Sequence, residues 1–260
     1  MVRRIFRPLR KKVISLIIPC YHKDYHRIEK ILPKIISKAA QYLIGEVIFV
    51  SNGPRTINLQ DKFPLNSSIL FRHEHTNSIG LGAAYKEGIK QATYSIICLS
   101  ASDLPFGFSD VAAYLCCKDQ SHASIFIGSK RHPKSIIFNR SIFRDVMSCS
   151  FYVLRKLFLN LKTPRDSQGT IIFTKTSLHA DPTSIGDDNY FYSCALLSWE
   201  VFYGGSFEEL PIQATLTQDN PSHMNIISTS LSMFWNLIRL RGRMIKLSGQ
   251  KKKHTRRCAF

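Results

Sequence analysis

One carboxylate stands out in the stretch LSASDLPFG at residues 99–107. Asp103 follows an apolar run, YSIIC, that has the character of a buried strand. A carboxylate at a strand end can offer oxygen to a hard cation such as Mg²⁺ or Mn²⁺, because Mg²⁺ keeps several waters and needs only one or two protein carboxylates. It can equally cap the turn that the following proline and glycine predict. The residue types leave both interpretations open.

A basic segment is the second candidate for chemistry. The candidate cations lie within fifteen residues, ahead of or on an amphipathic helix pattern: Lys130, Arg131, Arg140 and Arg144. The apolar positions of that pattern include Phe143, Val146, Met147, Leu154, Leu157 and Phe158. A basic loop joined to an apolar helix suits a ligand that is phosphate at one end and hydrocarbon at the other. A core helix that carries solvated arginines is the alternative.

Two histidines, His73 and His75, flank Glu74 in a strand-like run. Successive side chains on a strand point to opposite faces, so both histidines share a face that Glu74 does not. A zinc site needs at least three protein ligands, and the sequence offers no third one nearby. We expect no metal here.

The net charge of +18 is concentrated at the two ends of the chain. Residues 1–12 carry six basic residues and residues 239–257 carry nine, with no acid in either segment. Together they contribute 15 of the 18 charges. Such tails attract a polyanion, which can be a nucleic acid or an anionic membrane leaflet. Because the basic runs lack interleaved aromatic residues, specific nucleic-acid binding is not expected.

Residues 230–247 combine basic and apolar positions on neighbouring helical faces. The basic positions are Arg239, Arg243 and Lys246, and the apolar ones are Leu231, Phe234, Ile238 and Ile245. A helix lying in a membrane interface has this pattern. A C-terminal helix that packs on the domain and exposes its arginines has it too.

Length and composition predict one large α/β domain, or a domain with an appendage, because 260 residues with 44% hydrophobic content can bury a sizeable core. No apolar window is long enough to span a membrane, and the run VISLIIPCY is too short and strand-like for a secretory signal. The seven cysteines form no C-x-x-C pair, which is typical of a reducing cytosol. We expect a cytoplasmic protein.

Short β-rich runs alternate with helical patterns along the body of the chain. The predicted strands are residues 13–19, 46–51, 68–74, 94–100 and 123–128, and the predicted helices are residues 25–43, 83–92 and 109–117. Pro33 implies a kink or a later start in the first helix. This order predicts a mostly parallel sheet with helices on both sides and ligands at the carboxyl ends of the strands.

Those carboxyl ends carry the segments IPCYHKD, VSNGPRT, NSIGLGAAYKEG and LSASDLPFG in order. In this order the chain resembles family 2 glycosyltransferases of the GT-A (Rossmann-like) fold, in the branch of dolichyl-phosphate mannose and glucose synthases. The segments are similar to that family's VVIPxYNE, EIIVVDDGSxDxT, NxGxGxAxxxGxxxAxGDY and DADLP motifs. Further on, FIGSKRH, RSIFRDVMS, RDSQGTIIFTK and FEELPI continue the resemblance, which covers about residues 13–215.

The resemblance implies a role for each matching position. The nucleotide of a sugar donor would be bound by Pro19, Tyr21, Asp24, Asn52, Gly53, Gly80 and Gly82, although the family's first DDG acid is Ser51 here and its YNE acid is Lys23. The metal of the DAD motif would be held by Asp103 alone, since the first acid is Ala101. The cofactor would be Mg²⁺ or Mn²⁺.

The catalytic residues implied are Asp103, Lys130 and Arg144, with Lys130 meeting the donor phosphates and Arg144 the acceptor phosphate. Arg140, Asp166, Gln168 and Gly169 would border the acceptor or sugar. The family's late general base corresponds to Ala195. A phosphate acceptor needs no such base, because its second pKa near 6 leaves it largely ionised at neutral pH.

The resemblance therefore predicts a hexosyltransferase that moves a sugar from a nucleotide-sugar donor to a polyprenyl phosphate or another membrane-associated acceptor, at the cytoplasmic face of a membrane. Residues 1–12 form a basic tail, 13–220 the GT-A domain, and 221–260 a basic amphipathic helix and tail. The altered acidic motifs leave two alternatives: a GT-A domain that binds nucleotide or glycan without turnover, and a basic nucleic-acid-binding protein.

Overall fold

The computed structural model describes residues 13–21, 25–53, 59–64, 67–139, 142–215 and 226–257; within these ranges the side chains of residues 25, 60, 143, 144, 215, 226–229 and 251–257 are left undescribed. The strands are β1 (Ile14–Cys20), β2 (Ile44–Asn52), β3 (Leu70–Thr76), β4 (Ile96–Leu99), β5 (Ile125–Gly128), β6 (Ile136–Phe138), β7 (Ile171–Thr174), β8 (Phe207–Leu210) and β9 (Gln213–Thr215). The helices are α1 (Tyr25–Lys38), the 3₁₀ helix η2 (Gln60–Lys62), α2 (Leu81–Gln91), α3 (Ser109–Cys117), α4 (Ile142–Leu159), α5 (Tyr192–Phe202) and α6 (Ile226–Arg257).

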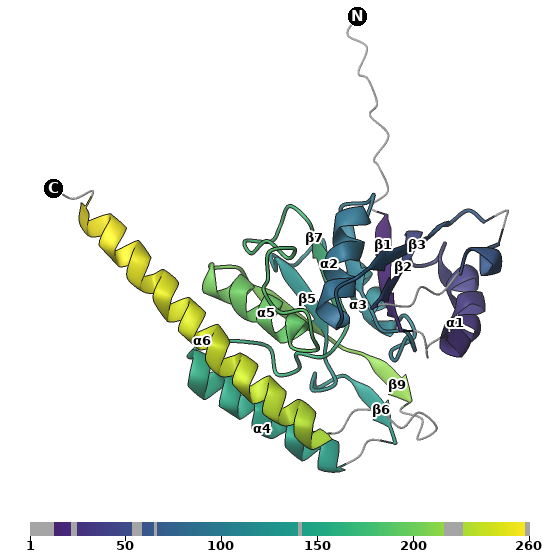
Figure 1. Cartoon of the computed structure of the whole chain (residues 1–260). Coiled ribbons are helices and arrows are strands. Elements are labelled where there is room, and N and C mark those ends of the chain that lie inside the picture. Colours follow the sequence, from purple (N-terminus) through teal and green to yellow (C-terminus); the bar gives the residue numbers. More distant parts are fainter. Residues whose placement is uncertain are drawn as a thin grey trace, which may run out of the picture.

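Seven strands form one twisted sheet in the order β3-β2-β1-β4-β7-β5-β8 (Figure 1). All neighbouring pairs are parallel except the two that involve β7. Strands β6 and β9 pair separately, below the carboxyl ends of β1 and β2 in Figure 1. The predicted mostly parallel sheet is confirmed.

Both faces of the sheet are covered, which explains why its strands show no polar alternation. One face of β1, including Ile17, packs with residues of α2 and α5, and Leu237 and Leu240 of α6 join the same cluster. The other face, including Leu16 and Ile18, packs with residues of α1 and α3. The result is the three-layer arrangement of a Rossmann-like α/β domain.

The first helix differs in detail from its prediction. It begins at Tyr25 and continues through Pro33 to Lys38, so the later start implied by the proline is wrong. The proline ring removes one intrahelical donor, yet residues on both sides of it, such as Ile28 and Ile35, are buried in the core. Burial of this apolar stripe outweighs the lost hydrogen bond.

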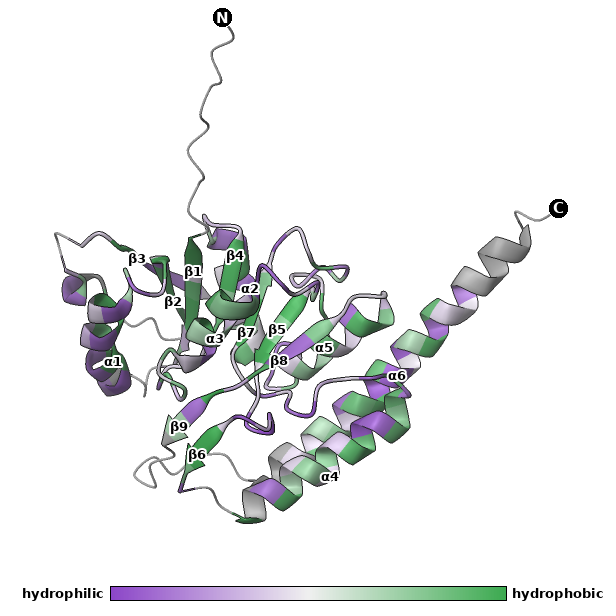
Figure 2. Ribbon diagram, turned by 180° about the vertical axis from the view of Figure 1, so that it is seen from behind, coloured by the Kyte–Doolittle hydropathy of each residue, from purple (hydrophilic) through white to green (hydrophobic). Residues whose placement is uncertain are grey.

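Helices α4 and α6 lie side by side at the edge of the molecule, away from α1 and β3 (Figure 2). Phe158 of α4 packs edge-to-face on Phe234 of α6, with ring centroids 5.6 Å apart. Among the described residues, no helix combines the length and the apolar character that crossing a bilayer requires.

Candidate active site

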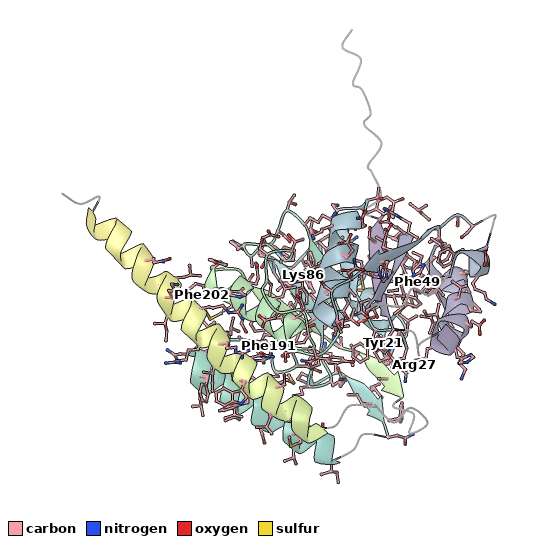
Figure 3. All side chains as sticks on the ribbon, in the orientation of Figure 1. Tyr21, Arg27, Phe49, Lys86, Phe191 and Phe202 are labelled. Carbon is pink, nitrogen blue, oxygen red and sulfur yellow. The ribbon has the colours of Figure 1, made fainter. Side chains whose placement is uncertain are left out.

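The carboxyl ends of the central strands meet at one edge because the strands are parallel and in register. Cys20, the last residue of β1, pairs with Ser51, and Ser51 pairs with His75 on the next strand. On the other side of β1, Ile17 pairs with Leu99, the last residue of β4. Tyr21, Asn52 and Asp103 therefore emerge at the same edge of the sheet; Figure 3 labels Tyr21 on the side of β6 and β9.

Asp103 is exposed, on a turn whose neighbouring side chains, Ser102 and Leu104, are buried. The turn is closed by its backbone, since Leu104 N donates to Ala101 O (3.1 Å) and Gly107 N donates to Leu104 O (2.9 Å). The carboxylate of Asp103 accepts no hydrogen bond from a described residue. The cap interpretation is therefore not supported, and the carboxylate is available to a ligand.

The backbone of this turn is strained next to the carboxylate. Leu104 has a positive φ of 44° although it is not a glycine. A leucine in the left-handed region costs roughly 1–2 kcal/mol. The side chain of Leu104 is buried in the core, which compensates this cost, while Asp103 beside it is exposed.

The single carboxylate of Asp103 fits a hard cation whose other ligands are not protein side chains. No group of three His, Cys, Asp or Glu side chains converges within the described part of the chain. One exposed carboxylate at a strand end is enough for Mg²⁺ or Mn²⁺ when phosphate oxygens and waters complete the shell. Asp103 is the residue that would hold such a cation.

The carboxyl end of β2 carries Ser51 and Asn52 in place of acidic residues. Ser51 is buried, and its Oγ lies 3.0 Å from Nδ1 of His75 and 3.1 Å from Nε2 of His73. Both histidines thus share one face of β3, as the alternation predicts, while Glu74 is paired with Arg72. Ser51 is enclosed by its neighbours and offers no charge to a ligand.

Burial of His73 makes the stability of the fold depend on pH. Desolvation, reinforced by the neighbouring His75, lowers the pKa of His73 below its ordinary value of 6.5. In the unfolded chain His73 takes up a proton as the pH falls through 6.5, whereas the folded protein resists until a lower pH. The contribution of neutral His73 to the unfolding free energy is therefore fully present above pH 6.5. It is lost as the pH falls from 6.5 through the pKa of His73 in the folded protein.

We expect His73→Gln to lose less unfolding free energy than the wild type between about pH 7 and about pH 5, because the substitution removes this titration. Urea unfolding at the two pH values measures the difference. His122→Gln is the matched control, since the His122 side chain is exposed. Equal pH dependence in wild type and His73→Gln would contradict the expectation.

Asn52 connects the second strand to the start of α2. Its Nδ2 donates to Gly80 O at 2.7 Å, which fixes the orientation of the amide because a carbonyl only accepts. Its Oδ1 is buried and has no hydrogen-bond partner among the described residues. Gly53, which follows, has a positive φ of 92° that favours glycine. A ligand that donates a hydrogen bond would satisfy Oδ1.

The glycines at the start of α2 allow a close backbone contact with the loop of residues 186–189. A Cβ on Gly80 would lie 2.2 Å from Asp188 O, and one on Gly82 would lie 2.4 Å from Asp187 O. Ala83 N donates to Asp188 O at 3.1 Å. The G-L-G segment is thus a tight helix start, and its role in nucleotide binding stays a prediction.

The 186–189 loop carries charged contacts that the sequence did not predict. Asp187 is buried and accepts a hydrogen bond from Nη2 of Arg243 on α6 at 2.7 Å. Asp188 forms an ion pair with Lys86 of α2. The loop is therefore fastened on one side to α6 and on the other to α2. Two glycines spaced two apart were the only sequence signal for this close approach.

The loop after β5 is held by Asp166. Its buried carboxylate accepts the N–H groups of Lys130 (3.1 Å) and Gln168 (3.0 Å). Lys130 Nζ lies 5.7 Å from the ring centre of Phe106, three residues after Asp103, so the structure brings Lys130 to the turn of Asp103. A Cβ on Gly169 would lie 1.8 Å from Gly128 O, which ties this glycine to the pairing of β5 with β7.

The remaining predicted residues fall into three groups. Pro19 is buried inside β1, opposite Val50, and Tyr21 is exposed just beyond the strand. Asp24 and Arg140 lie outside the described residues, and of Arg144 only the backbone, in α4, is described. Arg131 anchors α4, because its Nη2 donates to Asp145 O at 2.8 Å.

Three comparisons place this geometry among known proteins. The chain matches the model of "Glycosyl transferase family 2" over residues 15–178. It is similar in fold to crystal structures of glucosyl-3-phosphoglycerate synthase from Mycobacterium tuberculosis. The complex with uridine-diphosphate has a TM-score of 0.64 at 14% identity and covers 89% of this chain and 81% of that one. No curated protein matches the chain.

A second structure of the same synthase contains Mn²⁺, uridine-diphosphate and phosphoglyceric acid; it has a TM-score of 0.60 at 15% identity, with 90% of this chain and 78% of that one covered. At these identities the likeness establishes the shared GT-A fold. The family match extends over more than half of the residues, including the strand ends that carry Asn52 and Asp103. The chain belongs to glycosyl transferase family 2.

Proposed function

We propose that this protein is a hexosyltransferase that moves a sugar from a nucleotide-sugar donor to a phosphate-bearing acceptor. The observation that carries the proposal is Asp103: an exposed carboxylate with no described hydrogen-bond partner, on a turn at the carboxyl edge of the sheet. Departure of a nucleoside diphosphate leaves two negative charges that must be met by a cation. Asp103 is placed to supply the protein's ligand for one.

On the donor side, Tyr21, Asn52 and Gly53 border the nucleotide, and the unpaired Oδ1 of Asn52 accepts a hydrogen bond from it. Bound Mg²⁺ or Mn²⁺ would neutralise the diphosphate through the carboxylate of Asp103. Lys130 supplies a further positive charge beside the same turn. Structures of the similar mycobacterial synthase that contain Mn²⁺ and UDP support this assignment.

On the acceptor side, we assign Arg140 and Arg144 to the acceptor phosphate and Gln168 to the rim of the sugar pocket. Ala195, at the position of the family's late acid, is fully buried in α5 and provides no base. An ionised phosphate needs none, because it is already a nucleophile at neutral pH. Phosphoglyceric acid, bound by the similar synthase, is also phosphorylated. A polyprenyl phosphate is the acceptor class that we propose for this chain.

The test is a thermal-shift screen of nucleoside diphosphates with and without Mn²⁺, followed by turnover of the matching nucleotide sugar. We expect the nucleoside diphosphate of one particular base to raise the melting temperature, and only when Mn²⁺ is present. The reason is that the cation would be bound by both the diphosphate and Asp103. A shift without turnover of any sugar of that nucleotide would favour the alternative, a GT-A domain that binds without chemistry. The enclosure of Ser51 by two histidines is the observation that keeps this alternative open. No shift with any nucleotide would contradict both.

The acceptor implies a location, and we propose that the protein acts at the cytoplasmic face of a membrane. Nine basic residues and no acidic one lie in α6, which makes the C-terminal segment attractive to anionic lipids. The organisation proposed is a catalytic domain at residues 13–220, flanked by basic segments at 1–12 and 221–260.

A further inference from the structure

Helix α6 has an apolar stripe that nothing in the described structure covers. Leu231, Trp235 and Ile245 are 55%, 57% and 59% exposed. With the half-buried Ile238 they recur at spacings of three, four and seven residues, which aligns them along one side of the helix. The buried positions Leu237, Leu240 and Met244 lie on the opposite side and join the core. The exposed stripe therefore faces away from the domain.

Helix α4 repeats the arrangement. Among the side chains described on this helix, four large exposed apolar ones lie at spacings of four, seven and four residues: Ile142, Val146, Val153 and Leu157. Arg155 and Leu159, on the opposite side, are buried. Helices α4 and α6 lie side by side (Figure 2). Because each buries the side opposite its stripe, we treat the two stripes as one outward surface, the α4/α6 face.

Cations border this face on α6. Arg239 and Lys246 follow the stripe on one side and Arg241 on the other, and all three are exposed. Arg239, Arg243 and Lys246 also line a pocket of about 570 Å³ against the 186–189 loop. Arg243 and Lys86 pair with the two aspartates of that loop, whereas Arg239 and Lys246 form no ion pair with a described residue. The border is therefore positively charged.

We infer that the α4/α6 face docks on the surface of an anionic bilayer, with its stripes among the lipid chains and its bordering cations at the phosphates. An apolar stripe flanked by Lys and Arg is the composition of interfacial helices. A second copy of this chain is disfavoured as the occupant, because it would bring like charges together. The reason why the protein would dock on a membrane rests on the proposed function, with its lipid-linked acceptor. The argument that this face binds a bilayer does not depend on that acceptor.

The two tryptophans of the chain make the inference measurable. Trp235 is 57% exposed on the stripe, whereas Trp199 is 7% exposed in the core. We expect vesicles of phosphatidylcholine with phosphatidylglycerol to shift the tryptophan emission of the full chain to shorter wavelength, because Trp235 leaves water. Phosphatidylcholine alone should give a smaller shift at the same lipid concentration, since it lacks the anionic attraction. Trp235→Phe should still bind these vesicles but lose the shift.

The decisive variant is the pair Leu231→Glu and Ile245→Glu, which places two carboxylates on the stripe without touching the core. We expect it to lower the apparent affinity for anionic vesicles by at least roughly tenfold in sedimentation. Leu70→Glu with Ile36→Glu is the matched control, because these exposed apolar residues lie on β3 and α1. Unchanged melting temperatures would show that each variant is folded.

Several outcomes would overturn the inference. Sedimentation with vesicles but no change in the emission of Trp235 would mean that the basic tails bind alone. Equal binding by the wild type and the double variant would mean the same. A dimer in sedimentation equilibrium that the double variant abolishes would assign the face to a second copy. Turnover of a nucleotide sugar is measured with polyprenyl phosphate in detergent and without vesicles, so its absence would contradict the proposed function and leave this inference standing.

Discussion

We expect Asp103→Asn to abolish the proposed metal-dependent turnover of the nucleotide sugar, with kcat falling by roughly 100-fold or more. The amide keeps the size of the side chain but removes the charge that would hold Mg²⁺ or Mn²⁺ at the diphosphate. Folding should be unaffected, because the carboxylate has no described hydrogen-bond partner and the turn is closed by backbone bonds. Initial rates and melting temperatures, each with and without Mn²⁺, measure the two effects.

The matched control is Asp119→Asn, a second exposed carboxylate, on the turn after α3. It should retain wild-type turnover and the wild-type response to Mn²⁺. Full activity of Asp103→Asn would remove Asp103 from the mechanism. A loss of activity accompanied by a lower melting temperature in the absence of metal would instead indicate a structural role for the carboxylate.

We expect Gly80→Ala to destabilise the fold strongly. The residue has a positive φ of 123°, and its Cβ would lie 2.2 Å from the carbonyl oxygen of Asp188. With ψ at 162° this is a backbone region that essentially only glycine occupies, and it alone costs roughly 1–3 kcal/mol for an alanine. Because the contact is with backbone, the 186–189 loop must also move, and we expect a total loss of about 3–5 kcal/mol. Urea unfolding measures the loss.

Gly204→Ala separates the two components. Gly204 also has a positive φ, 92°, but a Cβ there meets no atom within 4 Å. It should therefore lose only the conformational part. Gly80→Ala should in addition raise the KM for the nucleotide sugar, because Gly80 O is the acceptor that orients Asn52. Equal losses of unfolding free energy in the two variants would mean that the 186–189 loop moves to accommodate the Cβ at no energetic cost.

The sequence predicted the layer order and the strands well, because patterns such as YSIIC at residues 94–98 encode burial locally. It also predicted that Tyr21, Asn52 and Asp103 lie at one edge, since parallel strands align their carboxyl ends. Local patterns could not choose between the two interpretations of Asp103. The structure adds that the turn is closed by backbone bonds rather than by the carboxylate, and the role of Asp103 as a metal ligand stays a prediction.

Local sequence patterns could not predict the ion pairs that hold the 186–189 loop. Asp187 pairs with a residue 56 positions away and Lys86 bonds with Ile185 O, 99 positions away. Nothing in the local composition of either segment indicates its partner. The same holds for Ser51, whose two histidine neighbours on β3 become visible only through the register of β2 with β3.

The ion pair of Arg243 with Asp187 makes α6 part of a continuous series of contacts. The series runs from α6 through the 186–189 loop to Gly80 and so to Asn52, at the edge where we propose that the nucleotide binds. Thermodynamic linkage applies to any two equilibria joined in this way. By whatever factor a bound nucleotide changes the affinity of the protein for a bilayer, the bilayer changes the affinity for the nucleotide by the same factor.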